Sequence, residues 1–592
     1  MRTYLWLLPL LLLVHSARAQ DPDTLEVVSV FPAAQSLTAA PDTPVILTFN
    51  TTVDPATVDS ASVMVFGRWS GVAKGTLAFE ADNTQIRFTP ERAFSAGETV
   101  TVALSRRLMS ATGHPMRSGF AAQFWTMPRR ASLDLVETDR LAVRRPAEGH
   151  VQTYGAYAGD FDGDGYTDFA VPNERANDVR FFMNDGAGSF GPPSIYPIPG
   201  GSEPSTNEGA DFNLDGKLDF AVGNRGGDKV SVFIGNGDGT LNGPTNYDAA
   251  DEVQGLAVLD LDGDGYPDIA TANRGSNQIA LLRNNGDGTF TRTQRITIEG
   301  DGAAAAAAAD ANEDGIMDLF VGTFSSREIL LYLGDGEGGL TFHTKGSIGG
   351  QSWMLATGDV NGDGHVDVVS ANSNDDHAAV VFNDGQGTLS SPVTYDSGQF
   401  PLAIDLGDLD GDGDLDMVTS NFRSADWTIF ENAGDGTFVN PSSLPAGQAA
   451  SCSVLHDRNN DGTLDMTGID ELVDLLFLFT NAPIDNTAAE APPPRLPFDL
   501  LPNYPNPFSR ETTVTFRLDA PGPVRLTVYD VLGREVVRLF DGVKERGAHM
   551  LTWDGRDRRG VLVSSGSYLY RLEAAGADRT RSMLFLAPPG TP

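Results

Sequence analysis

The sequence predicts an all-β chain in which a seven-bladed β-propeller is flanked by two β-sandwich domains. Three observations predict this class. One acidic motif recurs seven times between residues 160 and 465, at intervals of 49 to 51 residues. Each interval holds short strand-like segments and Gly-rich turns, and four strands per unit at such a period are typical of propeller blades. On both sides of the repeats, apolar residues alternate with polar ones between turn clusters, which indicates half-buried strands.

The N-terminus has the features of a secretory signal peptide over residues 1–19. Arg2 precedes an apolar run from Tyr4 to Val14, and Ala17-Arg-Ala19 forms a small-x-small cleavage site. We therefore expect an exported mature protein. No later stretch of about 18 apolar residues exists, so no transmembrane segment is expected.

Residues 20–130 are predicted to form the first sandwich. Alternating segments such as Val45-Ile-Leu-Thr-Phe49 and Thr99-Val-Thr-Val-Ala-Leu104 support strands. The signposts Phe49-Asn-Thr-Thr-Val-Asp54 and Phe124-Trp-Thr126 resemble a bacterial Ig-like domain of the kind found in surface-layer proteins. The segment shows no chemistry of its own, so we expect a spacer or a weak adhesive role.

The repeated motif has Asp at position 1, Asp or Asn at 3, Asp at 5, Gly at 6 and Asp at 9. Its first copy reads Asp160-Phe-Asp-Gly-Asp-Gly-Tyr-Thr-Asp168. A cation of Ca²⁺ size takes roughly six to eight oxygen ligands, and alternate side chains of a tight loop can converge on one ion. The glycine at position 6 permits the sharp turn around that ion. The motif therefore predicts a calcium loop.

We expect positions 1, 3, 5 and 9 to bind the ion through side chains. Position 7 varies freely and would contribute its backbone carbonyl. The seven loops thus predict up to seven structural Ca²⁺ ions. Their expected ligands are Asp160, Asp162, Asp164, Tyr166 and Asp168; Asp211, Asn213, Asp215, Lys217 and Asp219; Asp260, Asp262, Asp264, Tyr266 and Asp268; Asp310, Asn312, Asp314, Ile316 and Asp318; Asp359, Asn361, Asp363, His365 and Asp367; Asp408, Asp410, Asp412, Asp414 and Asp416; and Asp457, Asn459, Asp461, Thr463 and Asp465.

Two other interpretations of the motif were weighed. An EF-hand carries a Glu at position 12 and flanking helices, whereas here the loop is followed by apolar, strand-like segments such as Phe169-Ala-Val. A dockerin-like pair of helical loops is the alternative for any single copy. A solvated acidic turn would also explain one copy, but it does not explain seven.

The propeller is predicted over residues 134–482. The seventh unit lacks a Gly-rich turn and a fourth strand, so we expect a segment near residues 134–145 to supply its outer strand and close the ring. Residues 303–309 are all alanine and favour a helix by propensity. The repeat register instead places them on the innermost strand of the fourth unit, where small side chains suit a crowded channel.

These units resemble the FG-GAP or VCBS repeats of bacterial extracellular proteins, whose blades are similar to those of the integrin alpha-subunit propeller. The recurring calcium loop and the downstream Gly-rich turn, such as Asn285-Gly-Asp-Gly-Thr-Phe290, carry the resemblance. It implies that the loops connect first and second strands on one face, that their metal is structural, and that ligands bind the opposite face.

A Pro-rich linker is predicted over residues 483–499, followed by a second sandwich over residues 500–592. The segment contains Leu501-Pro-Asn-Tyr-Pro-Asn-Pro-Phe508 and Gly566-Ser-Tyr-Leu-Tyr-Arg-Leu572. It resembles the type IX secretion C-terminal sorting domain, which is similar to the Ig-like module of the flagellar hook-cap protein. The resemblance implies passage across an outer membrane by the type IX machinery. Because the chain continues past Leu586, a structural Ig-like cap is the alternative.

Composition excludes several partners and stabilising devices. The formal net charge of −39 argues against nucleic acid or an anionic membrane as a partner. Cys452 is the single cysteine, so no intrachain disulfide can form. Calcium is the expected substitute for disulfides in an exported chain.

Motifs of known enzymes are missing from the sequence. There is no His-Glu-x-x-His, no Gly-x-Ser-x-Gly and no P-loop, and the eight histidines show no ligand-like spacing. We expect no enzyme, but a calcium-binding protein that recognises an extracellular protein or polysaccharide. It would be secreted or held at the outer surface of a Gram-negative-type bacterium. The alternative is a secreted polysaccharide lyase or hydrolase.

A binding face, if present, is expected where the inner strands begin. Tyr154, Trp353 and Phe400 are candidate stacking surfaces there, and Glu203 and Glu252 are candidate polar partners. Ordinary lining of the channel is the competing interpretation of these five residues.

Overall fold

The computed structural model describes residues 24–484 and, with short gaps, residues 498–585. Nearly all regular structure is β-strand, which confirms the predicted all-β class. Within the described residues the only helices are the single-turn 3-10 helices η1 (Pro55–Thr57), η2 (Ala81–Asn83) and η3 (Ser373–Asp375), and none is long and apolar enough to cross a membrane. The predicted signal peptide and most of the Pro-rich linker lie outside the described residues. The chain divides into two compact units, Met1–Ile484 and Asp485–Pro592.

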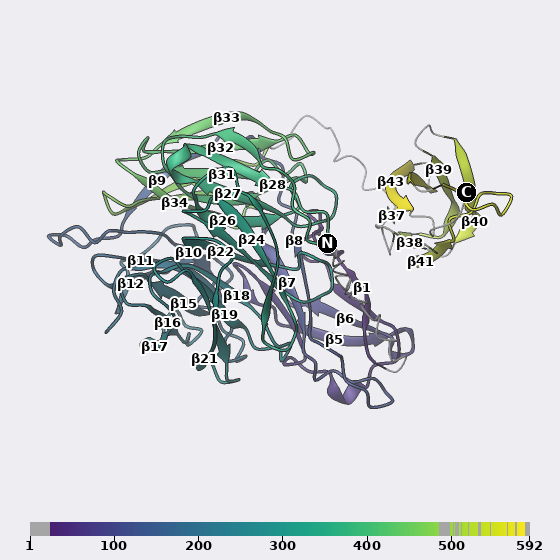
Figure 1. Cartoon of the computed structure of the whole chain (residues 1–592), viewed down its shortest axis with the longest axis horizontal. Coiled ribbons are helices and arrows are strands. Elements are labelled where there is room, and N and C mark those ends of the chain that lie inside the picture. The colour runs from purple at the N-terminus through teal and green to yellow at the C-terminus, as the bar shows by residue number, and fades with distance from the viewer. Residues whose placement is uncertain are drawn as a thin grey trace, which may run out of the picture. The chain divides into compact units, whose positions relative to one another are not determined.

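The first part of the larger unit is a sandwich of two four-stranded sheets (Figure 1). Its strands alternate between buried and exposed positions: Val45, Leu47 and Phe49 face the core, and the residues between them do not. One sheet has the order β1 (Val27–Phe31), β2 (Val45–Phe49), β6 (Gln85–Pro90) and β5 (Gly75–Glu80), and the other has the order β4 (Gly71–Val72), β3 (Val63–Gly67), β7 (Thr99–Leu104) and β8 (Phe120–Trp125).

The repeat region forms seven successive four-stranded antiparallel sheets within residues 136–480, which we number blade 1 to blade 7 in the order of the acidic motifs. Each motif joins the first, inner strand of a blade to the second strand. The blades are β10 (Tyr157–Gly159), β11 (Asp168–Asn173), β12 (Asp178–Phe182) and β13 (Ser194–Pro197); β14 (Pro204–Ala210), β15 (Asp219–Asn224), β16 (Lys229–Phe233) and β17 (Thr245–Asp248); β18 (Val253–Leu259), β19 (Asp268–Asn273), β20 (Gln278–Asn284) and β21 (Phe290–Thr297); β22 (Ala303–Ala309), β23 (Asp318–Thr323), β24 (Glu328–Gly334) and β25 (Leu340–Ser347); β26 (Ser352–Gly358), β27 (Asp367–Asn372), β28 (His377–Val381) and β29 (Val393–Asp396); β30 (Pro401–Gly407), β31 (Asp416–Asn421), β32 (Asp426–Asn432) and β33 (Phe438–Pro445); and β34 (Ala450–His456), β35 (Asp465–Asp470), β36 (Leu475–Thr480) and β9 (Val136–Ala142).

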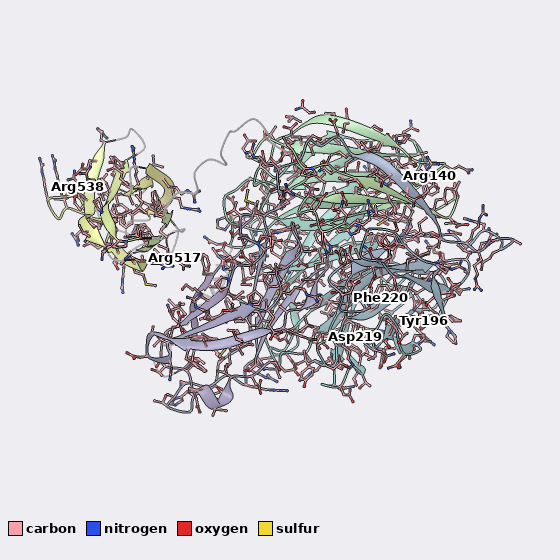
Figure 2. All side chains as sticks on the ribbon, turned by 180° about the vertical axis from the view of Figure 1, so that it is seen from behind. Arg140, Tyr196, Asp219, Phe220, Arg517 and Arg538 are labelled. Atoms are coloured by element: carbon pink, nitrogen blue, oxygen red, sulfur yellow. The ribbon has the colours of Figure 1, made fainter. Side chains whose placement is uncertain are left out.

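The expected closure of the ring by an N-terminal strand is confirmed. β9 pairs antiparallel with β36, so a strand that precedes blade 1 in sequence completes blade 7. The Arg140 guanidinium on β9 lies over the ring of Phe477 on β36, 4.4 Å from its centroid (Figure 2). Inner strands of successive blades are in contact, and β34 also contacts β10. The edge of β36 is therefore covered by β9.

The second strand of every blade is buried along its whole length because neighbouring blades cover both of its faces. Between blades 1 and 2, aromatic rings fill this space: Phe220 lies 5.7 Å from Phe181 and 6.2 Å from Phe233, and Tyr196 lies 6.2 Å from Phe233 (Figure 2). These edge-to-face and tilted contacts add to the burial of apolar area between blades.

The polyalanine segment is the strand β22, as the repeat register predicts. Its backbone lies very close to the inner strand of blade 3, because a Cβ placed on Gly255 would come within 2.7 Å of the Ala306 nitrogen. Larger side chains would not fit between these two strands. Helix propensity is overridden here by the close approach of the inner strands around the channel.

A buried asparagine connects neighbouring blades. The Asn432 Nδ2 donates to the Leu415 carbonyl of its own blade at 3.0 Å and to the Val360 carbonyl in the acidic loop of blade 5 at 2.8 Å. Its Oδ1 accepts from the Gly434 and Gly436 nitrogens. The same bond to the preceding blade is made by Asn184 to Arg458, Asn284 to Phe212, Asn383 to Ala311 and Asn481 to Leu409.

The smaller unit is a second sandwich with its own core. Val514, Phe516 and Leu518 alternate into that core, where Trp553 and Phe585 are also buried. One sheet has the order β37 (Phe498–Leu500), β38 (Thr512–Leu518) and β41 (Gly547–Trp553). The other sheet has the order β40 (Glu535–Lys544), β39 (Gly522–Asp530), β42 (Gly566–Ala574) and β43 (Ala577–Phe585). Figure 2 marks Arg538 on β40 and Arg517 on β38. Most of residues 501–507, where the predicted sorting motif begins, lie outside the described residues.

Asn432→Ala should destabilise the larger unit by about 2 to 4 kcal/mol, because it leaves two buried carbonyls and two backbone N–H groups without their partner. Urea unfolding of the full chain measures the change. Asn236→Ala, in the equivalent turn of blade 2 but exposed, is the matched control and should cost under about 0.5 kcal/mol. An equal effect of both substitutions would contradict the connecting role.

Candidate functional site

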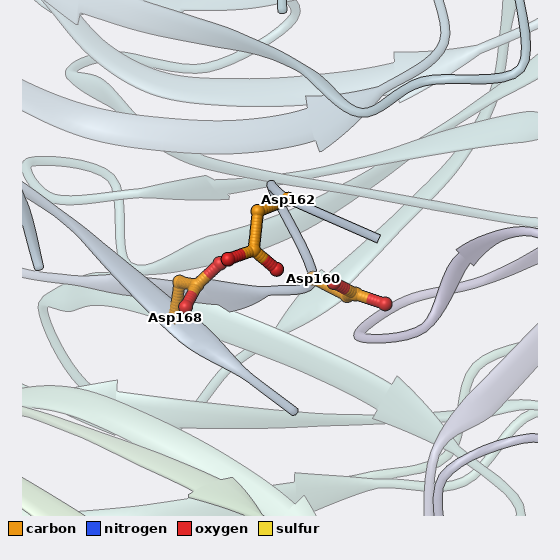
Figure 3. A group of neighbouring side chains, drawn as sticks. All are labelled: Asp160, Asp162 and Asp168. Atoms are coloured by element: carbon orange, nitrogen blue, oxygen red, sulfur yellow. The ribbon is translucent and has the colours of Figure 1, made fainter. Parts of the chain in front are cut away.

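The acidic loops gather carboxyl groups at one point. In the three loops with Asp at position 3, one carboxyl oxygen from each of positions 1, 3 and 9 lies within 4.8 Å of the other two. Figure 3 shows Asp160, Asp162 and Asp168 of the first loop. The other two sets are Asp260, Asp262 and Asp268, and Asp408, Asp410 and Asp416. The remaining four loops have an Asn amide at position 3.

Backbone hydrogen bonds hold these carboxyl groups in place. Asp160 accepts from the Gly163 and Gly165 nitrogens at 2.7 and 2.9 Å. Asp168 accepts from the Phe161 nitrogen inside the loop at 2.9 Å and from the Asn184 nitrogen at the end of the third strand at 2.8 Å. The position-9 carboxylate therefore ties the loop to the third strand of its own blade.

The same two bonds recur along the chain. A carboxyl oxygen at position 9 accepts from the residue sixteen positions later in all seven blades. The bond inside the loop is made in blades 1 to 6. These backbone bonds therefore fix the shape of each loop.

Burial makes these carboxyl groups costly to ionise. Burial, with the neighbouring aspartates adding to it, raises the pKa of Asp160 to about 6 and that of Asp168 to about 8. The pKa of Asp260 and that of Asp408 are raised to about 7 for the same reasons. A divalent cation with oxygen ligands would offset this repulsion, so the donor set fits Ca²⁺.

Positions 5 and 7 make further contacts in and beside the loops. At position 5, Asp164 lies outside the group of three and accepts from the Tyr166 nitrogen at 2.8 Å. In blade 3, Arg283 contacts the carboxylate of Asp262. In blade 5, Glu313 of the adjacent loop accepts a hydrogen bond from His365 and raises its pKa to about 9. The structure thus brings positions 1, 3 and 9 together in three loops. In three others, Asp314, Asp363 and Asp461 at position 5 each accept a hydrogen bond from the Asn at position 3.

The first sandwich and the segment after it contact the face that carries the acidic loops. Five of the seven loops receive hydrogen bonds from residues 92–131 or donate one to residue 69. These bonds are Asp160 N to Trp69 O, Arg92 Nη1 to Gly163 O, Arg106 N to Gly263 O, Ser105 Oγ to Asp264 O, Ala121 N to Gly315 O, Ala131 N to Asp410 O, Arg129 N to Gly462 O and Arg129 Nη1 to Asp461 O.

The opposite end of the channel, which we call the mouth, has an aromatic half. Trp353 donates from Nε1 to the Tyr154 hydroxyl at 2.8 Å, joining blade 5 to blade 1. Its ring lies 5.6 Å from Phe324 and 6.3 Å from Phe400, which in turn lies 6.3 Å from Phe422. All five rings are half-buried.

The other half of the mouth is charged. Gln152 Nε2 donates to Glu174 at 2.8 Å and to Glu471 at 3.0 Å, so one amide holds two buried carboxyl groups. Arg225 binds Glu174 at 3.3 Å and Glu203 at 3.1 Å. Burial raises the pKa of Glu174 and that of Glu471 to about 7.

Four of the five residues proposed from the sequence for a binding face lie in the mouth: Tyr154, Trp353, Phe400 and Glu203. Glu252 occupies the equivalent register position in blade 3, but among the described residues no hydrogen bond or ion pair joins its carboxyl group to this cluster. Sequence reasoning missed the residues that follow the second strands. They stand six positions after each position-9 Asp: Glu174, Arg225, Arg274, Phe324, Phe422 and Glu471. That fixed offset is the signal that could have found them.

Three family models match parts of the chain. The model described as an FG-GAP-like repeat matches residues 160–222, 211–271, 260–321, 310–370 and 359–419. A bacterial Ig-like domain matches residues 21–126, and the FlgD Ig-like domain matches residues 505–578. The chain therefore contains FG-GAP-like repeats, which have a β-propeller fold, and Ig-like domains on either side of them. No curated protein matches the chain.

Solved structures with similarity to the chain include an Agrocybe aegerita lectin described by its recognition of non-reducing terminal N-acetylglucosamine. That alignment has a TM-score of 0.39 and 21% identity, and covers 55% of this chain and 87% of the lectin. BBS1N in complex with ARL6DN aligns with a TM-score of 0.43 and 11% identity. This alignment covers 60% of this chain and 98% of the BBS1N chain. A Lactobacillus plantarum protein aligns with a TM-score of 0.40 and 14% identity. This alignment covers 66% of this chain and 98% of that protein.

Chelation of calcium should lower the melting temperature of the larger unit by roughly 10 °C or more, because up to seven bound ions add to its stability. It should also speed hydrogen exchange in residues 92–131, which are bonded to the loops. Calorimetry and exchange mass spectrometry with EDTA measure both effects, and calcium-loaded EDTA is the control. Unchanged melting would contradict structural calcium.

Acid should weaken calcium binding, because the ion must displace protons from carboxyl groups whose pKa is raised to between about 6 and 8. Titration calorimetry at pH 5.5 and 7.5 should show at least a tenfold tighter affinity at the higher pH. The ion-free chain should show the opposite trend. Its folded state binds more protons than the unfolded state between about pH 4 and 8, so its free energy of unfolding falls as the pH rises. Affinity independent of pH would contradict carboxylate ligation.

Proposed function

We propose that the chain is an exported, calcium-binding β-propeller protein that binds polysaccharide at the mouth of its channel. The observation that carries this proposal is the division of the mouth into an aromatic half and a charged half. Sugar rings offer apolar C–H faces that pack on aromatic side chains, and hydroxyl groups that bond to carboxylates, amides and guanidinium groups. The mouth offers both kinds of surface within one opening.

The placement of the calcium loops supports the same division of roles. The loops lie at the other end of the inner strands and are hydrogen-bonded to the first sandwich. Metal there would stabilise the ring and hold the sandwich, while the mouth stays free for a ligand. Seven blades with integrin-alpha-like loops, each holding up to one Ca²⁺, are part of this proposal.

Export and localisation rest on the two ends of the chain. The signal peptide over residues 1–19 and the similarity of residues 505–578 to the FlgD Ig-like domain support secretion. In this proposal residues 500–592 act as a type IX sorting domain, and the protein works outside the cell or at the outer surface of a Gram-negative-type bacterium.

One observation favours a second function, hydrolysis or elimination of a polysaccharide. Glu174 and Glu471 are buried, share the Gln152 amide and have a pKa raised to about 7. A carboxyl group that stays protonated near neutral pH can act as a general acid beside a second carboxylate. Binding is favoured over this function because the Arg225 guanidinium and the Gln152 amide already occupy these groups.

Trp353→Ala should lower polysaccharide affinity at least tenfold, because it removes the central ring of the aromatic half. A glycan array with the full chain identifies the ligand, and titration calorimetry measures the change. Phe342→Ala, an exposed aromatic on the outer strand β25, is the matched control and should leave affinity unchanged.

Mass spectrometry of the same mixtures separates the two functions. Intact glycan with binding lost in Trp353→Ala supports recognition. Shortened glycan, with product formation abolished in Glu174→Gln, would replace the binding proposal by the enzymatic one.

A further inference from the structure

Two arginines lie against the aromatic half of the mouth. The Arg274 guanidinium of blade 3 lies over the Phe324 ring, 4.2 Å from its centroid, and 5.4 Å from the centroid of Trp353. The Arg423 guanidinium of blade 6 lies over the Phe400 ring, 4.0 Å from its centroid. The aromatic half therefore carries one guanidinium group from blade 3 and another from blade 6.

Contact with the rings positions both guanidinium groups without using their hydrogen-bond donors. A guanidinium group has five N–H donors around its edge, whereas its flat face can rest on an aromatic ring. Among the described residues, no acceptor is bonded to the side chain of Arg274 or Arg423, and no carboxylate forms an ion pair with either. Arg274 is half-buried and Arg423 is exposed, so a ligand can reach both.

The nearby carboxyl groups do not neutralise these two arginines. The Glu252 carbonyl accepts from the Arg274 nitrogen, but within the described part of the chain its carboxylate makes no ion pair with the guanidinium group. In the charged half of the mouth, Glu174 and Glu471 are only 3% and 6% exposed. The more exposed Glu203 is already paired with Arg225 at 3.1 Å.

We propose, on the basis of the polysaccharide-binding function above, that the polysaccharide recognised at the mouth is anionic. Its sugar rings pack on the aromatic half, and its carboxylate or sulfate groups accept hydrogen bonds from Arg274 and Arg423. These two arginines are then the residues that select an acidic glycan over a neutral one.

The geometry of the guanidinium group favours an acidic acceptor. Two parallel N–H donors match two oxygens of one anionic group, whereas a sugar hydroxyl engages a single donor. Hydrogen bonds between charged partners are about twice as strong as those between neutral ones. The adjoining rings exclude water from one face of each guanidinium group, which strengthens its attraction to an anion.

The net charge of the chain, −39, does not prevent an anion from binding at the mouth. The acidic loops lie at the other end of the inner strands, and a seven-residue strand such as β22 spans about 20 Å. At physiological ionic strength, charges are screened over about 8 Å. The charge of the loops is therefore largely screened at the mouth, whereas Arg274 and Arg423 would contact the ligand directly.

A glycan array probed with the full chain in calcium gives the first test. It carries the acidic glycans oligogalacturonate, alginate and κ-carrageenan, and the neutral glycans laminarin, mannan and xylan. The strongest signal should come from an acidic glycan. A strongest signal from a neutral glycan overturns the anionic assignment and leaves the polysaccharide-binding function standing, whereas binding to no glycan contradicts both.

The strongest acidic glycan is then compared with its own neutral form by titration calorimetry. Methyl esterification removes the charge of the two carboxylated glycans, and desulfation removes that of κ-carrageenan, so the pair identifies which acidic group is recognised. Neutralisation should weaken binding at least tenfold, and equal affinity overturns the proposal. Poly-L-glutamate carries carboxylates without sugar rings. Binding of poly-L-glutamate as tight as that of the glycan would assign the site to an acidic protein and also overturns the proposal.

Arg274→Gln and Arg423→Gln should each lower affinity for the acidic glycan roughly tenfold, because each removes a charge-assisted contact. Arg107→Gln is the matched control. The Arg107 guanidinium also lies over a ring, 5.3 Å from the centroid of Tyr266, but it belongs to the first sandwich at the other end of the inner strands. Its substitution should leave affinity unchanged. Thermal melting checks that all three variants fold, and unchanged affinity in both mouth variants overturns the proposal.

Salt dependence separates recognition of charge from support of the rings. Added NaCl should weaken binding of the acidic glycan to the parent chain more steeply than binding to the Arg274→Gln Arg423→Gln double variant, because screening acts on the charge that the substitutions remove. Arg274→Lys keeps the charge but lacks the planar fork, so its affinity should lie between those of the parent chain and Arg274→Gln. An equal salt dependence in the parent chain and the double variant would mean that the arginines only pack on the rings, and it overturns the proposal.

Discussion

The larger unit depends on the carboxylate at position 9 of each acidic loop. In six blades it accepts one N–H from inside its loop, and in all seven it accepts one from the end of the third strand. A buried carboxylate that orders backbone N–H groups holds the loop in a shape that draws positions 1 and 3 toward it. The aspartate clusters that could hold a metal ion, the turn geometry and the surface that receives the first sandwich all follow from this arrangement.

The cost of that arrangement explains why a cation is expected. Aspartates such as Asp168 and Asp416 are buried near other carboxyl groups, and burial raises the pKa of each to about 8. Without an opposite charge, folding must either protonate these groups or keep like charges together. A chain with a net charge of −39 and one cysteine has few other ways to stabilise seven such loops. Metal binding and folding are therefore expected to be coupled.

The two ends of the inner strands carry different side chains. At one end, the loops are hydrogen-bonded to the first sandwich, and the Arg68 carbonyl accepts from the Tyr157 hydroxyl of blade 1. At the other end, aromatic rings and paired carboxyl groups surround an opening.

The sequence by itself determined the repeating parts. The motif period placed the loops between first and second strands, predicted β9 as the closing strand and correctly made Ala303–Ala309 a strand. These features depend on neighbours within one blade or on adjacent inner strands, so a regular register describes them. Only the tertiary structure decided how Trp353 meets Tyr154, how Gln152 joins Glu174 to Glu471, and how Arg68 reaches Asp405. Those contacts cross the channel or join separate domains, and no local period specifies which side chains from distant blades converge on one point.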